Sequence, residues 1–135
     1  MGSPESCADE AMAYINVLER FISVPFPRVL HLGCGAGGYD FYFKNHFSVT
    51  GVDISEGMLE IAKNTNPEIT YIKGDMRNVR LDEKFDAVLI PDSIAYMSTL
   101  EGLWAALRNA AAHMKPRGVL LVVAHTKEEF RNNNF

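Results

Sequence analysis

The chain has 135 residues, enough for one domain with a real hydrophobic core but too few for two full domains. Lys and Arg number 13 against 17 Asp and Glu, and the resulting net charge of −4 argues against nucleic-acid backbone binding as the main task. Hydrophobic residues make up 47% and charged residues 22% of the chain, values that exclude wholesale disorder.

The first residues and the cysteines bear on the cellular compartment. Met1 to Ser6 show no basic stretch followed by an apolar one, which argues against a secretory signal, and no apolar run approaches the ~18 residues of a membrane span. Cys7 and Cys34 form no CxxC pair, which argues against a disulfide scaffold and a cysteine zinc site. We therefore expect a soluble, cytoplasmic protein without a metal site and without membrane or nucleic-acid partners.

Segments with helical and strand-like patterns alternate along the chain. Ser55 is a typical N-cap, and Ser98 followed by Glu101 is a capping-box pattern that opens the last helix. In chain order we expect a helix at 5–22, a strand at 28–32, a helix at 39–46, a strand at 49–53, a helix at 55–64, strands at 69–73 and 85–90, a helix from 98 to 114, and a strand at 119–124. This alternation predicts a single α/β domain over residues 1–135 with a mainly parallel sheet.

A glycine-rich loop follows the first expected strand, in the stretch RVLHLGCGAGG from Arg28 to Gly38. Glycines permit a tight turn there and let a ligand approach the backbone, while the next helix offers its N-terminal N–H groups. The spacing fits the dinucleotide pattern GxGxxG and also the tighter GxGxG, so the loop alone does not identify the ligand.

Asp53 closes the second expected strand, 20 residues after Gly33. A carboxylate at this place can accept hydrogen bonds from both hydroxyls of a ribose. An acidic residue at a strand end is by default only solvated, but the glycine loop upstream favours ribose binding.

Five blocks of the sequence resemble, in order and spacing, the successive motifs of class I S-adenosylmethionine-dependent methyltransferases. The blocks are VLHLGCGAGG, VTGVDISEGMLEIAKN, YIKGDMRNV, KFDAVLIPDSIAYM and LRNAAAHMKPRGVLLVV, and they cover residues 28–124. The resemblance implies a Rossmann-like three-layer core with a mainly parallel sheet of about five strands. The family's core continues past the fifth strand with a helix and an antiparallel strand pair, so we expect the family's last two strands to be missing here.

The resemblance also implies which residues bind S-adenosylmethionine. Backbone around the loop would wrap the methionine part of the cofactor, Asp53 would hold the ribose, and the segments after the second and third strands would contact the adenine. Pro91 follows the fourth strand, where the family places the methyl-transfer region. The implied cofactor-binding residues are His31, Gly33, Cys34, Gly35, Gly37, Asp53, Ile54, Asp75, Met76 and Pro91. Among them Ile54 would lie against the adenine, Asp75 would accept from its amino group, and Met76 would lie beside the ring.

His31 departs from the family pattern, because Asp or Glu usually stands two residues before the first glycine. That acid helps to anchor the ammonium group of the cofactor, directly or through water. A histidine would do so only in part, and would repel the ammonium when protonated. We therefore expect His31→Asp to tighten cofactor binding.

No residue is assigned a catalytic role from the sequence. Methyl transfer from a sulfonium is a direct in-line displacement in which the protein mainly positions the reactants and excludes water. Side chains after the fourth and fifth strands are candidates, although each also fits a purely structural role: Asp92, Ser93, Tyr96 and His125. His113, in the last turn of its helix where a cation suits the dipole, is interpreted as structural.

Three functions remain open. The first is a methyltransferase acting on a small molecule, with PDSIAYM and LEGLWAALRNAAAHMKP looking most like enzymes that include methylases of amino-sugar nitrogens. The second is a non-catalytic protein, or a truncated core, that binds S-adenosylmethionine or S-adenosylhomocysteine. The third is a dinucleotide enzyme, against which Asp75 and His31 count.

The fifth expected strand, at 119–124, is apolar at every position and contains no proline or lysine. With no later segment to pair with it, this strand would form an exposed edge of the sheet. We therefore expect a homodimer through this strand or the surface next to it.

Overall fold

The computed structural model describes residues 4–91 and 99–123. Their strands form one parallel sheet in the order β3-β2-β1-β4-β5. The strands are β1 (Arg28–Leu32), β2 (Ser48–Asp53), β3 (Thr70–Lys73), β4 (Phe85–Ile90) and β5 (Met114–Val122). The helices are α1 (Pro4–Phe21), α2 (Asp40–Phe43), α3 (Glu56–Thr65) and α4 (Leu100–Ala112). The predicted α/β class and five-stranded parallel sheet are confirmed.

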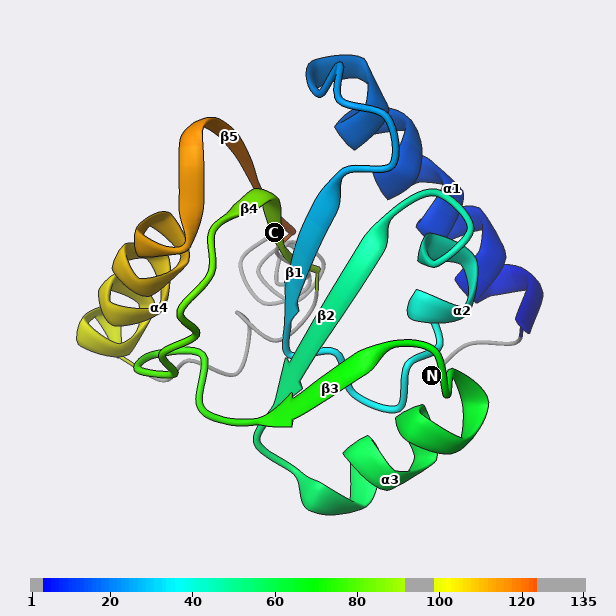
Figure 1. The fold of residues 1–135 in the computed structure, drawn as a ribbon. Coiled ribbons are helices and arrows are strands. Elements are labelled where there is room, and N and C mark those ends of the chain that lie inside the picture. Colours follow the sequence, from blue (N-terminus) through cyan, green and yellow to red (C-terminus); the bar gives the residue numbers. More distant parts are fainter. Residues whose placement is uncertain (1–3, 92–98, 124–135) are drawn as a thin grey trace, which may run out of the picture.

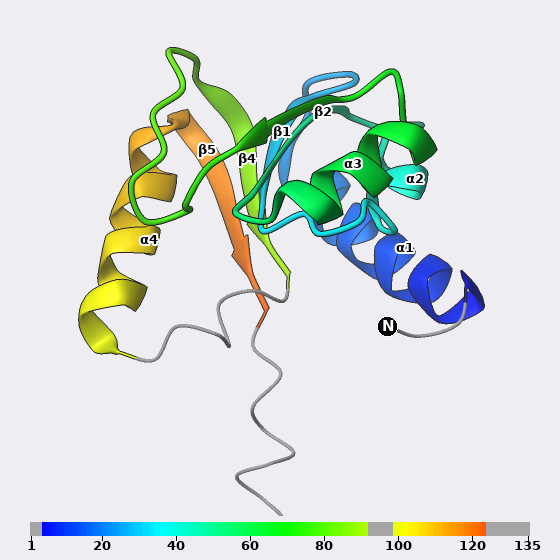
Figure 2. The same cartoon turned by 90° about the horizontal axis from the view of Figure 1, so that it is seen from below.

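Helices cover both faces of the sheet and make three layers (Figures 1 and 2). Helices α1, α2 and α3 lie on one face, and α4 lies on the other. Successive side chains of a strand point to opposite faces, so β1 serves both layers. Val29 packs with the residues of α1 to α3, whereas Leu30 and Leu32 pack on the side of Ala106 in α4.

Two element starts differ from the prediction by two residues or more. The N-cap of α4 is Thr99, whose hydroxyl oxygen accepts from the backbone N–H of Gly102 at 3.0 Å, so the capping box that begins at Ser98 is wrong. Strand β5 begins five residues early, because Met114 already pairs with Phe85. The residues from Lys115 to Gly118 then form an irregularity opposite Asp86 before Val119 pairs with Ala87. The first error arises because Ser98 and Thr99 are both good N-cap residue types, and the second because the residues from Lys115 to Gly118 have the composition of a turn.

Helix α2 is also shorter than predicted. It spans Asp40–Phe43, and the three residues that follow it continue as turns rather than as helix. The backbone N–H of His46, for example, donates to the carbonyl of Phe43, three residues back. The short helix brings the chain back to β2 at once.

Strand β5 pairs only with β4 among the described residues, so it forms an edge of the described sheet. The strand includes Lys115 and Pro116, so the expectation of an edge without lysine or proline is wrong for its first half. The homodimer stays a prediction. Within the described ranges, none of the helices combines the length and the apolar character needed to cross a membrane.

Candidate functional site

The candidate site lies where β1 and its neighbours end. Strand β1 sits in the middle of the sheet, with β2 on one side and β4 on the other. The chain therefore winds away from β1 in both directions, which creates the switch point where open α/β sheets bind ligands. The glycine loop leaves β1 at this point, and Asp53 ends the neighbouring strand β2.

The glycine loop is fixed by its backbone. Gly33, Gly35 and Gly37 have φ angles of 77°, 58° and 83°, a region that side chains disfavour. The N–H groups of Gly33 and Cys34 donate to the carbonyl of Val52 at 2.7 and 3.0 Å, which anchors the loop to β2. A methyl group added at Gly35 would meet nothing within 4 Å, so the backbone there faces open space.

Asp53 ties the end of β2 to this loop. Its Oδ1 accepts from the N–H of Gly35 at 3.1 Å, and its Oδ2 accepts from the N–H of Ser55 at 3.0 Å. Each carboxylate oxygen can accept a further hydrogen bond, and the side chain is only half-buried. The carboxylate is thus oriented by the backbone and still able to receive two hydroxyls, as a ribose requires.

His31 does not stand alone at the end of β1. Its Nδ1 lies 2.6 Å from Oδ1 of Asp40, and both side chains are buried, with 1% and 0% exposure. The hydroxyl of Tyr71 donates to the other oxygen of Asp40 at 2.8 Å. Sequence reasoning missed Asp40 and Tyr71; an acid inside the aromatic stretch Tyr39–Phe43 was the available signal.

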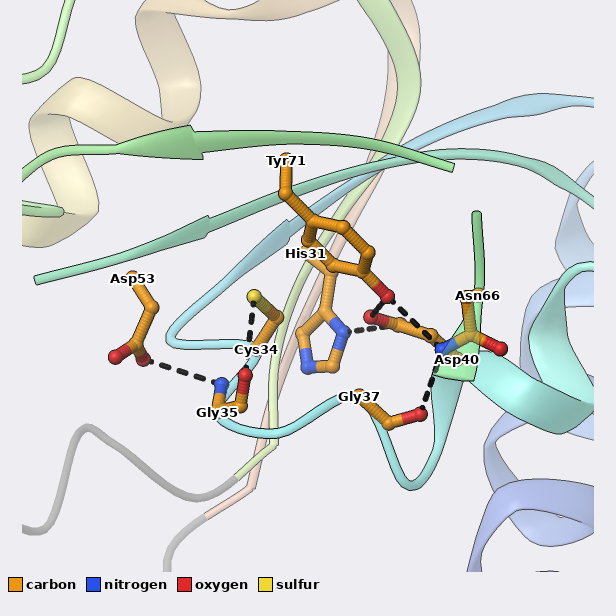
Figure 3. Close-up of polar contacts among 8 residues, drawn as sticks. All are labelled: His31, Cys34, Gly35, Gly37, Asp40, Asp53, Asn66 and Tyr71. Atoms are coloured by element: carbon orange, nitrogen blue, oxygen red, sulfur yellow. Dashed lines mark hydrogen bonds and ion pairs between the residues drawn. The ribbon is translucent and has the colours of Figure 1, made fainter. Parts of the chain in front are cut away.

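The buried chain of polar groups continues to the glycine loop (Figure 3). The amide nitrogen of Asn66 donates to the hydroxyl oxygen of Tyr71 at 3.1 Å and to the carbonyl of Gly37 at 3.0 Å. A Cβ at Gly37 would lie 2.8 Å from that amide nitrogen, and a Cβ at Gly51 would lie 2.5 Å from the ring of Tyr71. Both glycines therefore make room for this network.

Burial and nearby negative charges disfavour ionisation of the Tyr71 hydroxyl and the Cys34 thiol. Burial, followed by the negative charge of Asp40, raises the pKa of the Tyr71 hydroxyl. Burial, followed by the charges of Asp40 and Asp53, raises the pKa of the Cys34 thiol. Cys34 therefore stays protonated near neutral pH and acts as a packing residue rather than as a nucleophile.

The residues expected around an adenine lie at the ends of β2 and β3. The backbone N–H of Gly74 donates to the carbonyl of Asp53 at 3.0 Å, which joins these two strand ends. Ile54 is 64% exposed, whereas Met76 is buried in the core on the α4 side. Asp75 already pairs with the guanidinium of Arg77 at 2.6 Å, and hydrogen bonds from Arg77 lower the pKa of that carboxyl.

The region after β4 is described only at its start. Pro91 is buried directly after the strand. The candidate residues Asp92, Ser93, Tyr96 and His125 lie outside the described residues.

His113 is structural, as expected, but not as a helix-dipole cation. Its Nε2 accepts from the backbone N–H of Leu81 at 3.0 Å, and its Nδ1 donates to the carbonyl of Asn109 at 2.8 Å. A ring that accepts through one nitrogen and donates through the other is neutral.

Comparisons with known proteins agree with this geometry. A family model described as a methyltransferase domain matches residues 29–118. A dTDP-3-amino-3,4,6-trideoxy-alpha-D-glucopyranose N,N-dimethyltransferase from Streptomyces venezuelae is 40% identical over 96 residues, which are 70% of this chain and 40% of that protein. A malonyl-[acyl-carrier protein] O-methyltransferase from Bacillus cereus is 31% identical over 129 residues, or 90% of this chain and 46% of that protein.

A solved structure shows the same fold. The S-adenosylmethionine-bound amino pentose methyltransferase CalS10 from Micromonospora echinaspora superposes with a TM-score of 0.81 at 30% identity, covering 85% of this chain and 50% of that one. The chain thus spans half or less of the length of these relatives. With two thirds of its residues matched by the family model, the chain belongs to the methyltransferase domain family.

Proposed function

We propose that this protein transfers a methyl group from S-adenosylmethionine to a small-molecule acceptor, and that the acceptor atom is an amine nitrogen. The observation that carries the proposal is Asp53, a carboxylate oriented by two backbone N–H groups beside the open face of Gly35. The amine is supported by the names of relatives, which include several N,N-dimethyltransferases of amino sugars.

Each part of the site has a proposed task. Asp53 accepts the ribose hydroxyls, and the backbone from Gly33 to Gly37 cradles the methionine part of the cofactor. Ile54 covers one face of the adenine, and Asp75 shares its oxygens between Arg77 and the adenine amino group. Met76 supports this edge from the core, and Pro91 leads the chain towards the transfer region.

The cofactor supplies the activated methyl group when it is bound. The chain's own residues hold the acceptor nitrogen in line with that group and exclude water, and such orientation is worth roughly 7–11 kcal/mol in favourable cases. A neutral amine attacks without a metal and needs only to lose a proton afterwards.

Calorimetric titration with S-adenosylmethionine, S-adenosylhomocysteine and NAD tests the cofactor. We expect the two adenosyl ligands to bind and NAD not to bind. Asp53→Ala should weaken binding of the adenosyl ligands by about 1–3 kcal/mol, because the bound ribose hydroxyls lose their acceptor. Glu56→Ala is the matched control, since it removes an exposed carboxylate three residues away. Equal affinity in wild type and Asp53→Ala would exclude the ribose assignment.

Methylation of dTDP-linked amino sugars, followed by mass spectrometry, tests the acceptor. We expect the mass of the amino sugar to rise by one or two methyl groups. Methylation of hydroxyl acceptors alone would overturn the amine assignment. Cofactor binding without any transfer would favour a non-catalytic binding protein.

A further inference from the structure

Two buried polar atoms of the network have no partner among the described residues, Nε2 of His31 and Oδ1 of Asn66, and only the first lies on a side chain at the end of β1. Nε2 of His31 has no hydrogen-bond partner among the residues that the structure describes, although the ring is 1% exposed. Buried polar atoms in proteins are almost always paired, because an unpaired one loses its hydration without compensation. The atom is therefore a candidate contact for a ligand.

The hydrogen-bond network determines what this atom offers. The oxygen of Tyr71 accepts from Asn66, so the hydroxyl hydrogen of Tyr71 goes to Asp40. Asp40 thus accepts on one oxygen and faces Nδ1 of His31 with the other. Since a carboxyl is ordinarily a stronger acid than an imidazolium, the proton between them lies on Nδ1. Nε2 is left with a lone pair and acts as an acceptor.

The charge of this cluster favours a cationic donor. With a neutral ring, the pair carries the single negative charge of the Asp40 carboxylate, and no Lys or Arg pairs with Asp40 in residues 4–91 and 99–123. The rings of Tyr39 and Phe43, which flank His31 at 6.5 and 5.7 Å between centroids, bring no positive charge. A buried carboxylate without a cation is costly, so a bound cation would stabilise it.

The position of the ring agrees with a ligand contact. In Figure 3 the imidazole of His31 points from β1 towards the loop between Gly35 and Gly37, with its second nitrogen turned away from Asp40. The amide of Asn66 fixes the carbonyl of Gly37 to the same network. In Figure 3 the lone pair is directed towards the loop that the proposed function gives to the methionine part of the cofactor.

We propose that His31 and Asp40 act together as one anionic acceptor for the α-ammonium group of S-adenosylmethionine. Nε2 of His31 contacts the ammonium, and Asp40 is a positioning residue that holds the proton on Nδ1 and supplies the negative charge. The inference rests on the proposed function, because it needs an adenosyl ligand that carries an amino-acid group.

This pairing changes the expectation for His31→Asp. The sequence suggested tighter binding, on the premise that no other acid was near, but Asp40 lies against the ring. The variant would place two carboxylates together, so one of them must take up a proton or the site must distort. His31→Asp combined with Asp40→Asn keeps a single carboxylate and should bind S-adenosylhomocysteine better than His31→Asp alone.

Asp40→Asn tests the pair without changing its shape. The amide would donate to Nδ1, move the ring proton to Nε2, and present a donor where the ammonium needs an acceptor. We expect S-adenosylhomocysteine to bind about ten- to a hundredfold more weakly, the usual worth of a hydrogen bond to a charged group. The analogue that keeps the carboxylate but lacks the α-amine, and methylthioadenosine, should each change by no more than about twofold.

Nitrogen NMR of the imidazole gives a second readout, because it observes the tautomer on which the acceptor role of Nε2 depends. In the wild type, His31 should carry its proton on Nδ1, and in Asp40→Asn it should carry it on Nε2. Tyr71→Phe is the matched control: it disturbs the same buried network but leaves the bond between Asp40 and His31, so the proton should stay on Nδ1.

The outcomes separate this inference from the proposed function. Absence of S-adenosylhomocysteine binding by the wild type would overturn both. Binding by the wild type, with Asp40→Asn weakening all three ligands equally, would overturn the acceptor pair alone. A wild-type His31 with its proton on Nε2 would also overturn it.

Discussion

The part of the chain that the structure describes contains two buried histidines, on opposite faces of the sheet, that differ in how their rings are satisfied. His113 follows α4 and has both ring nitrogens bonded to backbone groups, of Leu81 and Asn109. His31 ends β1 under the glycine loop, bonds to Asp40 through one nitrogen, and leaves the other without a partner in the described residues. Their exposures, 3% and 1%, do not distinguish them.

The difference shows what each region is built for. The core on the α4 side is apolar, and its one buried histidine completes backbone hydrogen bonds. The face that carries α2 buries a chain of side-chain hydrogen bonds that ends at a loop with three positive φ angles. Departures from a fully satisfied, apolar core concentrate at functional sites, because ligand contacts require groups that the fold alone does not satisfy.

The largest expected effect comes from the loop itself. Gly37→Ala should lower the free energy of unfolding by about 3–5 kcal/mol, because the backbone is left-handed and the methyl group would clash with Asn66 and Tyr71. Gly35→Ala has the same backbone penalty without the clash and should lose about 1–2 kcal/mol. Urea unfolding of the two variants measures the difference, and equal losses would show that the network does not constrain Gly37.

A variant of His113 tests whether the buried histidine on the α4 side has only a structural role. His113→Leu should cost about 2–3 kcal/mol of stability, since the N–H of Leu81 and the carbonyl of Asn109 lose their partners. The same variant should bind S-adenosylhomocysteine normally, which calorimetry checks. Weakened binding with an unchanged melting temperature would contradict the structural role.

Alkaline pH should weaken the face that carries α2. The raised pKa values of Tyr71 and Cys34 mean that the folded chain keeps protons that the unfolded chain releases above about pH 8.5 to 10. Stability is therefore fully present at lower pH and falls as the pH rises, by at most ~1.4 kcal/mol per pH unit for each group. Urea unfolding of wild type and Tyr71→Phe at rising pH should show the shallower fall in the variant. Identical slopes would argue against Tyr71 as a source of the effect.

The smallest stability change is expected for a variant that removes the unsatisfied pair. In a Tyr71→Phe background, where no hydroxyl is left without its acceptor, His31→Leu combined with Asp40→Leu replaces a buried polar pair by apolar groups, a change that should keep stability within about 1 kcal/mol of the Tyr71→Phe variant. Binding of S-adenosylhomocysteine should nevertheless weaken. Retained affinity in this combined variant would remove the functional reason for the pair.

The elements whose residues follow a local hydrophobic period or capping pattern could be predicted from the sequence. Strands β1 and β4 have the expected bounds, and Ser55 caps α3 as its position before an apolar period indicated. The start of β5 was missed because its pairing with β4 shifts register after Phe85. The residues from Lys115 to Gly118 have the composition of a turn, and only the pairing of Met114 with Phe85 extends the strand across them.

The candidate site, too, could be predicted only in part. The glycine loop and Asp53 carry a recognisable spacing, and the structure joins them through the bond from Gly35 to Asp53. Asp40 and Tyr71 were missed because they are 31 residues apart and meet only after the sheet forms. No spacing in the sequence indicates such a contact.

A nitrogen NMR titration of the wild type with S-adenosylhomocysteine tests the account most directly, because it observes both buried histidines in one sample. The Nε2 signal of His31 should move on ligand addition, while both nitrogen signals of His113 should stay in place. Saturation of the protein, verified by calorimetry, with no change at His31 would contradict it.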